Sequence, residues 1–503
     1  MHKIAKRLII VIPAVLLQLA WLYILGVWFS HWAVPVGMIL TVLSFVLVIF
    51  IMTKRDEGAY KMLWLLVILL FPLPGTILYL VFGNKRTTRP LRKKLEAAPA
   101  LPPLPEAAAS VGVSLAADNL RVAQTFRYVE RLTGSSVAYA ESARYFSLGD
   151  TMFPAMLEAV EQAQEFIFAE YFIVERGVMW DTLVEALERK VAQGVDVRIM
   201  YDDLGSISTY DIHGVWELKE KGIRCIPFNP LLFVRGTLNY RDHRKMLVVD
   251  GTVAFSGGIN LADEYINHVE RFGHWKDIGF ELTGAPAQAY TRMFAEFWNA
   301  FANDPIPERF LAPVSAVHTV ANGYVLSYYD SPLRPHAVSN ELYIDLLSQA
   351  TRYAWFFTPY LLPGEALLDA LVRAAERGVD VRIIMPGVPD KKIVFRMAHG
   401  FYPTLLAAGV KIYEYTPGFV HAKGCVVDDV LGTVGTVNLD YRSLFLHFEN
   451  NSLFYRSSLL ADLKADFEAT QAQCREMVLG HNVRESFGGW LVNGVLRLFA
   501  PLC

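Results

Sequence analysis

Cysteine is scarce in this chain of 503 residues, and its few cysteines show no metal-binding spacing. Structural zinc sites need pairs such as CxxC, and disulfide frameworks need closely set cysteines in a short secreted chain. The sequence therefore predicts neither, and a reducing cytosol suits its thiols. The four cysteines are Cys225, Cys425, Cys474 and Cys503.

An excess of charge of one sign is also missing, because 47 Lys and Arg stand against 50 Asp and Glu and give a formal net charge of -3. Proteins that bind nucleic acid usually carry a clear basic excess. We therefore predict no nucleic-acid partner. One local basic cluster occupies residues 85–94. It fits contact with anionic lipid headgroups, and it equally fits a signal that only sets membrane topology.

Hydrophobic residues make up 53% of the sequence, and long apolar runs gather near the amino terminus. Residues 8–30 and 34–52 contain no Asp, Glu, Lys or Arg. Each run has roughly the 20 residues that a helix needs to cross a bilayer. We predict two membrane-spanning helices, and not a cleaved signal peptide, because the first run is too long and the second follows directly.

A third apolar run, residues 62–83, is interrupted by Pro72, Pro74 and Gly75. Since proline kinks a helix, this run is either a kinked third span or a hairpin that enters and leaves on one side. Basic residues precede the first run, lie at 54–61 and follow the third run, whereas the connection between the first two runs has none. Cytoplasmic flanks carry the positive excess. The hairpin is therefore favoured, and residues 1–84 are predicted to be a multi-pass anchor in the cell membrane.

Beyond the anchor, residues 85–120 form a basic, proline- and alanine-rich linker, in which 97–110 is not expected to form one continuous helix. The chain then repeats itself, since LVEALERKVAQGVDVRIM at 183–200 matches LLDALVRAAERGVDVRII at 367–384. We predict two copies of one domain, at 121–312 and 313–480. An apolar tail at 481–503 either packs on the core or touches the membrane.

Both copies predict the same local structure. Residues 166–174 and 355–362 are short apolar runs typical of buried strands, and segments with helical spacing follow them. Gly194 and Gly378 stand where a helix C-cap belongs, and a second strand begins after each. Strand, helix and strand together indicate an α/β fold whose mixed sheets are covered by helices.

The most informative feature is the motif His-x-Lys-x4-Asp, which occurs twice, 178 residues apart. In each copy a glycine follows the aspartate by seven residues, and an asparagine follows that glycine by three. Alternation along a strand predicts that histidine and lysine share one face and that a tight turn begins at the aspartate. The two copies are His243, Lys245, Asp250, Gly257 and Asn260, and His421, Lys423, Asp428, Gly435 and Asn438.

These residue types suit phosphoryl transfer. One imidazole can attack phosphorus while the other protonates the leaving oxygen. Lysines and asparagines can hold the phosphate oxygens. Since each half offers one histidine, the pair requires both halves face to face about a pseudo-twofold axis. A metal site is disfavoured, because lysine two residues after histidine is a poor ligand neighbour.

Four carboxylates are candidates for a supporting role. Asp250 and Asp428 are grouped with the catalytic residues because they belong to the motif. They stand at turns and are predicted to organise the site and not to act as direct acids, although simple turn formation explains them in part. Glu449 lies 26 residues after Lys423, and Asp277 has a comparable place after the first motif. Either acid can bind the far nitrogen of a catalytic imidazole and fix its tautomer. The alternative for both is an exposed surface acid.

The double motif and its surroundings resemble the phospholipase D superfamily. Several strings resemble bacterial cardiolipin synthases more closely: LNYRDHRKMLVVDG, YDDLGS, PFNP, GGINLADEY, TPGFVHAKGCVVDD, GTVNLDYRSL, LHFENN and the amino-terminal RDEGAYKMLWLLVILLFPLPGTILYLVFG. The similarity covers nearly the whole chain. Gly258 and Thr436 depart from the serine that many superfamily members carry, so one hydroxyl contact is missing from the first half and replaced in the second.

This resemblance implies duplicated phospholipase D-type domains and transfer of a phosphatidyl group between two phosphatidylglycerol molecules, giving cardiolipin and glycerol through a phosphatidyl-histidine intermediate. His243 is the nucleophile by family precedent, whereas the motifs alone leave the two histidine roles interchangeable. Neither a cofactor nor a metal is implied. The alternative is a membrane phospholipase D that lets water attack, or a phosphatidyltransferase that uses another alcohol.

The expected partners are phosphatidylglycerol and other anionic membrane lipids, and the oligomeric state is not predicted. The expected place is the cell membrane, with the catalytic domains facing the cytoplasm.

Overall fold

The computed structural model falls into two compact units, Met1–Pro90 and Leu91–Cys503. The residues that it describes are 12–13, 15–24, 30–54, 56–83, 89–102, 107–140, 142–210, 212–230, 239–313, 323–483 and 487–500.

The first unit contains a helical hairpin over the third apolar run. Helix α3 (Gly58–Leu70) ends at Phe71, whose φ of -131° and ψ of 74° leave the helical region just before the prolines. Helix α4 (Pro72–Leu78) and a π-helix (Tyr79–Gly83) then return along α3. The Tyr60 hydroxyl donates to the Gly83 carbonyl at 3.4 Å, which shows that the ends of the run meet. The chain therefore turns back near the residues that the sequence indicated.

No helix in the described part of the chain combines the length and the hydropathy that crossing a bilayer requires. The spans predicted at 8–30 and 34–52 are therefore not supported by the structure. The first run is described only at 12–13, 15–24 and 30, and the second falls in helix α2 (Ser30–Met52).

Three helices lead into the sheets of the second unit: α5 (Arg89–Ala97), α6 (Ala107–Asp118) and α7 (Leu120–Thr133). Helix α6 begins inside the segment predicted to be a tether, because the alanine-rich residues after the last proline favour a helix. Asn119 caps α7 by accepting from the amides of Arg121 and Val122, and Gly134 ends it at a φ of +74°. The irregular part of the linker is thus shorter than predicted.

The first half is built on a seven-stranded mixed sheet in the order β2-β9-β7-β6-β3-β4-β5. Strands β3, β4 and β5 run parallel, and the other pairings are antiparallel. Its elements are β2 (Ser142–Phe146), α8 (Gly149–Gln162), β3 (Phe166–Tyr171), α9 (Val178–Ala192), β4 (Asp196–Asp202), α10 (Asp203–Ser206), α11 (Ile212–Glu220), β5 (Arg224–Phe228), β6 (Met246–Val249), β7 (Val253–Gly257), a 3-10 helix (Asp263–Ile266), β8 (His274–Lys276), β9 (Gly279–Thr283), α12 (Ala287–Phe301) and a 3-10 helix (Glu308–Leu311).

The second half repeats this order within a nine-stranded sheet, β1-β10-β19-β17-β16-β11-β13-β14-β20. Strands β1 (Ala138–Tyr139) and β20 (Cys474–Met477) are the additions at its edges. The other elements are β10 (Tyr324–Asp330), α13 (Val338–Gln349), β11 (Tyr353–Phe357), β12 (Leu361–Leu362), α14 (Glu365–Glu376), β13 (Asp380–Pro386), α15 (Lys392–His399), α16 (Tyr402–Ala407), β14 (Lys411–Tyr415), β15 (Gly418–Val420), β16 (Gly424–Val427), β17 (Leu431–Gly435), β18 (Leu439–Asp440), α17 (Tyr441–Phe445), β19 (Glu449–Tyr455), α18 (Leu459–Gln471) and α19 (Phe487–Phe499).

The repeated sequence segments form the crossover units that were expected. Helices α9 and α14 each end before a glycine in the left-handed region, Gly194 at a φ of +92° and Gly378 at +90°. Each glycine then starts the chain into a parallel strand, β4 or β13. The α/β fold with mixed sheets is thus confirmed.

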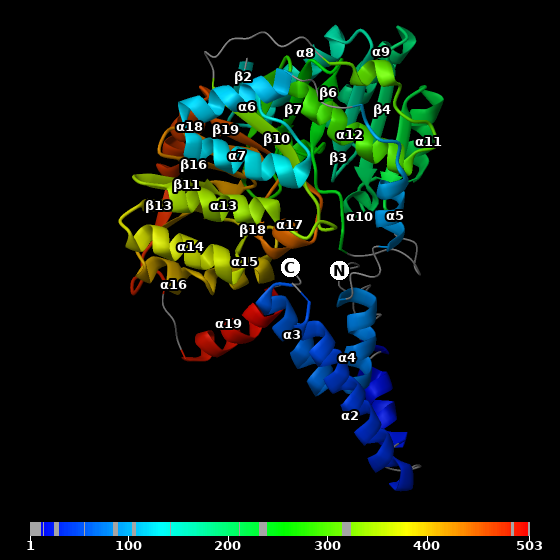
Figure 1. Ribbon diagram of the computed structural model, residues 1–503, viewed down its shortest axis with the longest axis vertical. Helices are drawn as coiled ribbons and strands as arrows, with labels where there is room; N and C mark the ends of the chain where they lie inside the picture. The colour runs from blue at the N-terminus through cyan, green and yellow to red at the C-terminus, as the bar shows by residue number, and fades with distance from the viewer. Residues whose placement is uncertain are drawn as a thin grey trace. The chain divides into compact units, whose positions relative to one another are not determined.

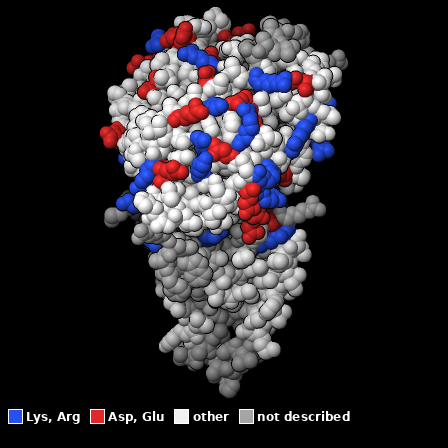
Figure 2. Space-filling view, turned by 90° about the vertical axis from the view of Figure 1, so that its left-hand side faces the viewer, with Lys and Arg blue, Asp and Glu red and all other residues white. Residues whose placement is uncertain are grey.

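The two halves share one aromatic core, which draws on both sheets and on helices α12 and α18. The Phe168 and Phe294 rings stack there at 4.6 Å. Separate cores lie under α8 and α9 in the first half and under α13 and α14 in the second (Figure 1). On the face of the second unit seen in Figure 2, acidic and basic side chains are interspersed, in keeping with the near-neutral composition.

Candidate active site

Both motifs lie just before a strand and are held by the opposite half. His243 and Lys245 precede β6, so the prediction that they sit on the strand itself is wrong. The amide of His243 donates to the carbonyl of Phe448 at 2.9 Å, and the amide of His421 donates to the carbonyl of Lys276 at 2.7 Å. Each motif is thereby joined to the segment of the other half that precedes a buried acid.

Each half supplies the acid that binds the histidine of the other half, which is an exchange of acids between the halves. Nδ1 of His243 lies 2.9 Å from both carboxylate oxygens of Glu449, and Nδ1 of His421 lies 2.7 Å from Oδ2 of Asp277. Both acids are fully buried, so the alternative of an exposed surface acid is wrong for each. With Nδ1 occupied, Nε2 is the nitrogen of each imidazole that is left for chemistry.

The surroundings of the two acids differ. Thr436 Oγ1 donates to Glu449 Oε2 and Ser443 Oγ donates to Oε1 at 2.6 Å, whereas Asp277 Oδ1 accepts from the amide of Ile278 at 2.8 Å. Burial raises the pKa of Glu449 well above its usual range. Burial acts on Asp277 in the same direction, but the attraction of His421 and Lys423 outweighs it and leaves the pKa of Asp277 lowered. Asp277 is therefore the acid that holds its negative charge more firmly.

The two lysines are buried beside the histidines. Lys245 Nζ donates to the carbonyl of His243 at 2.7 Å, and Lys423 Nζ donates to the carbonyl of His421. Burial lowers the pKa of Lys245 to about 8 and that of Lys423 to about 7. A bound phosphodiester anion would favour the charged form of both ammonium groups and so be held by them.

The charges of the two motifs act on one another, as a single site requires. Burial, and then the charges of Lys245, His447, Lys423 and His421, lower the pKa of His243 well below its usual range. Burial and Lys423 together lower the pKa of His421 to about 4. Both imidazoles are therefore neutral in the free site near pH 7, and a phosphodiester anion between them makes protonation of one easier.

Asp250 and Asp428 both stand at turns, as the sequence indicated. Each stands at the turn of its hairpin with a positive φ, 49° and 53°. Asp250 accepts from three backbone amides at 164–166, and Asp428 from three at 351–353. These amides lead into β3 and β11, so each carboxylate ties a hairpin to the neighbouring strand. These contacts are structural, and the place of Asp250 and Asp428 among the catalytic residues stays a prediction.

The two asparagines of the motifs have unequal contacts. Asn260 accepts from the amide of Ile173 at 3.0 Å and donates to the Tyr265 hydroxyl at 2.7 Å. The Tyr265 ring stands edge-on to His421, with 5.3 Å between the ring centroids. Asn438 is also buried, and its Oδ1 has no hydrogen-bond partner among the described residues. A direct role of Asn260 and Asn438 in binding phosphate therefore stays a prediction.

Sequence reasoning missed a buried ion-pair network that holds the first motif. Both carboxylate oxygens of Asp202 lie 3.0 Å from Nε of Arg241. Arg244 pairs with Asp242 at 2.9 Å and with Glu170. Charges inside otherwise apolar strand sequences were the available signal, since Asp202 ends β4 and Glu170 lies within β3. The matching second-half positions hold no charged residue.

A third imidazole lies on the first-half side of the site. The ring of His447 is 5.9 Å from that of His243, and Arg442 Nε donates to Nε2 of His447 at 3.2 Å. Because arginine stays protonated, this contact assigns the proton of neutral His447 to Nδ1. Trp275 holds the matching place beside His421, at 5.5 Å. The histidine of LHFENN was the signal that sequence reasoning did not use.

Two facing half-sites, each with an imidazole and a buried ammonium group, define a duplicated catalytic domain of the phospholipase D type. A family model described as "Cardiolipin synthase, PLD-like domain" matches residues 156–298 and 343–471, and one described as "Phospholipase_D-nuclease N-terminal" matches 39–84. The chain belongs to the cardiolipin synthase family.

Individual relatives agree with this assignment. A cardiolipin synthase of Geobacillus sp. (strain WCH70) is 34% identical over 467 residues, which cover 91% of this chain and 92% of the relative. An uncharacterized protein of Streptococcus mutans is 42% identical over 460 residues, covering 90% of this chain and 99% of the relative. Among solved structures, phosphatidylserine synthase of Haemophilus influenzae Rd KW20 has the same fold, with a TM-score of 0.56 at 16% identity, covering 76% of this chain and 98% of that one.

Proposed function

We propose that this protein is a cardiolipin synthase that joins two phosphatidylglycerol molecules and releases glycerol. The observation that carries the proposal is the exchange of acids, since each histidine keeps Nε2 for chemistry only because the other half binds its Nδ1. The family assignment supports this reading. Transfer from one phosphodiester to another needs no external energy source.

In the first step, Nε2 of His243 attacks phosphorus of one phosphatidylglycerol, and the bond from phosphorus to the glycerol oxygen breaks. The proton on Nε2 of His421 moves to that oxygen, so glycerol leaves as a neutral alcohol. Lys245 and Lys423 offset the negative charge that builds on the phosphoryl oxygens. The choice of His243 as nucleophile rests on the family resemblance, because the geometry of the two imidazoles is nearly symmetric.

In the second step, neutral His421 takes the proton from a hydroxyl of a second phosphatidylglycerol. That oxygen bonds to phosphorus, the bond from phosphorus to His243 breaks, and cardiolipin forms. The competing acceptor is water, which would give phosphatidic acid. Exclusion of water from the site favours the lipid alcohol.

The decisive experiment separates the two acceptors. Purified protein is incubated with phosphatidylglycerol bilayers in water enriched in oxygen-18, and the products are measured by mass spectrometry. We expect unlabelled cardiolipin and one glycerol for each cardiolipin. Labelled phosphatidic acid as the main product would replace the synthase with a hydrolase, and a different phosphatidyl ester formed on addition of another alcohol would indicate a broader transferase.

Attachment to the membrane through the first unit is part of the proposal. Helix α2 carries large apolar side chains that are each more than half exposed, an amount of apolar surface that is unusual in contact with water. The finer proposal is that residues 1–84 are inserted in the cell membrane and that both catalytic halves face the cytoplasm. The large apolar side chains of α2 that are more than half exposed are Met38, Ile39, Val42, Leu43, Phe45, Val46, Ile49 and Met52.

Single cysteines test this orientation in a background that lacks the four native cysteines. An impermeant thiol reagent added to intact cells should leave cysteines at residues 2, 57 and 219 unlabelled, and it should label them after the membrane is opened. Labelling of residue 2 in intact cells would contradict the orientation.

A further inference from the structure

A narrow pocket, with no room for a water molecule in this structure, lies under helix α15. Val394, Phe395 and Ala398 of α15 line one side of it. Phe419 lines another side, and its ring centroid is 5.9 Å from that of His421. Phe419 thus lies between the surroundings of helix α15 and those of one reacting imidazole.

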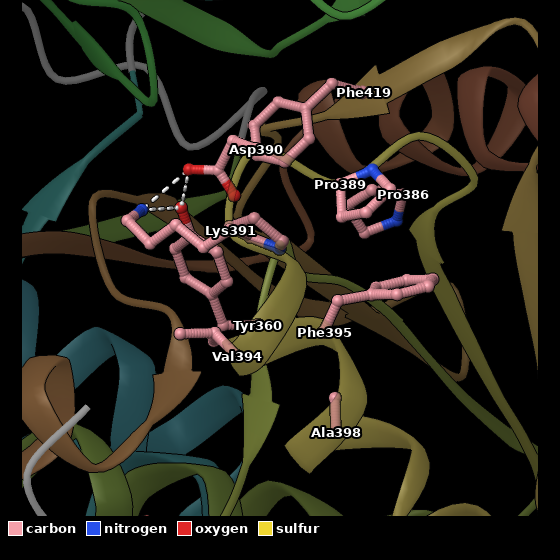
Figure 3. A pocket seen from close by; sticks show the side chains of 10 residues that line it. Tyr360, Pro386, Pro389, Asp390, Lys391, Val394, Phe395, Ala398 and Phe419 are labelled. Atoms are coloured by element: carbon pink, nitrogen blue, oxygen red, sulfur yellow. Dashed lines mark hydrogen bonds and ion pairs between the residues drawn. The ribbon is translucent and has the colours of Figure 1, made fainter. Parts of the chain in front are cut away.

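One edge of the pocket is polar. Asp390 accepts from Lys391 Nζ and from the Tyr360 hydroxyl, both at 2.6 Å. Figure 3 shows these three groups joined on one side of the pocket, with Phe395 away from them on another. Helix α15 therefore has a charged group at its start and apolar side chains along its inner side.

The opposite side of α15 faces outward and combines basic and apolar residues. Lys392, Ile393 and Arg396 share one side of the helix and are exposed, Ile393 by 62%. Met397 and Ala398, on the other side, are buried. Lys392 and Arg396 form no ion pair with an acid in the described part of the chain, so their charges are available to an external partner.

Helix α19 continues this surface. It is fixed beside α15 by Arg497, which lies 4.5 Å from the centroid of the Phe401 ring, and by Ala500, which is buried. Val492, Val495 and Phe499 point outward at helical spacing and are between 41% and 50% exposed. A helix with an exposed apolar stripe beside basic residues is the type that lies in a membrane interface.

We infer that the α15–α19 face, made by Lys392, Ile393, Arg396, Val492, Val495 and Phe499, docks on an anionic phospholipid bilayer. Basic residues without acidic partners are attracted to anionic headgroups. The apolar stripe enters the boundary between headgroups and acyl chains. Helix α15 is the shared wall, because one side of it belongs to the docking face and another to the pocket. This inference rests on the proposed function for its substrate and adds the surface by which the substrate arrives.

Hydrogen exchange of the full-length protein tests docking without any assay of activity. The protein is compared in vesicles that contain phosphatidylglycerol and in vesicles of phosphatidylcholine alone. We expect slower amide exchange in peptides covering 387–399 and 487–500 with phosphatidylglycerol. Peptides of α11 are the control, because Trp216 is 59% exposed there and Lys219 lies beside it. Equal exchange of α15 and α19 in both vesicles would overturn the inference.

Charge reversal provides the second test. The double substitution Lys392→Glu and Arg396→Glu should reduce cardiolipin formation on phosphatidylglycerol vesicles about tenfold or more, since each basic residue near an anionic surface is worth roughly fivefold in binding. The rate on short-chain phosphatidylglycerol dissolved as monomers should change less than twofold. Lys219→Glu is the matched control on α11. Equal losses with both substrates, or no loss with vesicles, would overturn docking at this face.

These outcomes stay separate from those of the proposed function. If the unaltered protein forms no cardiolipin from either substrate, the proposed function fails, and the exchange measurement alone then decides whether the face docks.

Discussion

Gly258 leaves the space in which the carboxylate of Asp277 lies. A Cβ placed on Gly258 would be 2.0 Å from Oδ1 of Asp277 and 2.9 Å from the carbonyl oxygen of His421. In the second half, Thr436 takes the matching position and donates its hydroxyl to Glu449. The departure from serine at residue 258 therefore has a steric cause, since any side chain there displaces the acid that holds His421.

Gly258→Ala should lower kcat by roughly tenfold to a hundredfold, the range for losing a group that orients a reacting imidazole. The measurement is cardiolipin formation on phosphatidylglycerol vesicles, together with thermal unfolding to confirm that the protein is folded. Gly112→Ala is the control, because a Cβ there meets only a methyl group of Val137 at 3.9 Å. Full activity of Gly258→Ala would mean that Asp277 does not need its present position.

The two buried acids should respond differently to loss of charge. Asp277→Asn should reduce kcat by about 10²–10⁴-fold, as in triads that lose the acid behind histidine. Glu449→Gln should cost less, because burial already raises the pKa of Glu449 and so favours its neutral form. Glu281→Gln is the control, since that acid pairs with Arg144 at the surface. Losses of equal size would show that both acids act as anions.

Asp250→Ala should act on stability and not on chemistry. The substitution removes a carboxylate that accepts from three amides, and we expect the free energy of unfolding to fall by about 2–3 kcal/mol. The activity of the protein that remains folded should be within about threefold of the original, as active-site titration would show. A loss comparable to that of His243→Ala, at unchanged stability, would place Asp250 with the catalytic residues.

Activity should fall as the pH is raised, and the fall should begin at a pH that is unusually low for the deprotonation of lysine. Burial lowers the pKa values of Lys423 and Lys245 to about 7 and about 8. Raising the pH through this range removes the positive charges that hold the phosphodiester, so kcat/KM should fall above pH 7–8. The profile of kcat/KM reports on the free enzyme. A profile that stays flat to pH 10 would show that both lysines keep ordinary pKa values.

Chelation should leave the rate within about twofold. Within the described ranges, no cluster of three His, Cys, Asp or Glu side chains is placed to hold a metal ion. Each reacting histidine already has Nδ1 bound to an acid, and a lysine of its own motif lies next to it. The test is turnover after dialysis against EDTA. Loss of activity that one divalent ion restores would contradict the metal-free mechanism.

Much of the fold was predictable because it follows local rules. The repeat of 183–200 at 367–384 gave the two crossover units, and Gly194 and Gly378 marked the ends of their helices. The turn after the first motif followed from Asp250 and the glycine after it, and the repeat of the motif placed Asp428 at a second turn. Local rules failed where a contact from elsewhere in the chain decides the outcome. His243 and Lys245 lie outside β6 because the Phe448 carbonyl, and the acids that pair with Arg241 and Arg244, hold that segment.

The candidate site was predictable as a set of residues but not as a set of partners. The sequence nominated Glu449 and Asp277 without showing which histidine each one serves. The histidine and its acid are 206 positions apart in one pair and 144 in the other. The pairing therefore depends on how the two halves pack, and the sequence of one half alone does not determine it. Asp250 and Asp428 were placed with the catalytic residues because of their spacing, whereas their carboxylates bind backbone amides.

The exchange of acids bears on how such a site can evolve. One half by itself would present its histidine without the acid that binds Nδ1. Two halves joined face to face supply that acid to each other. The two halves differ in how the acid is held in place. Gly258 leaves space for Asp277, whereas Thr436 donates a hydrogen bond to Glu449. A substitution in either motif is therefore best understood from the residues that face it in the other half.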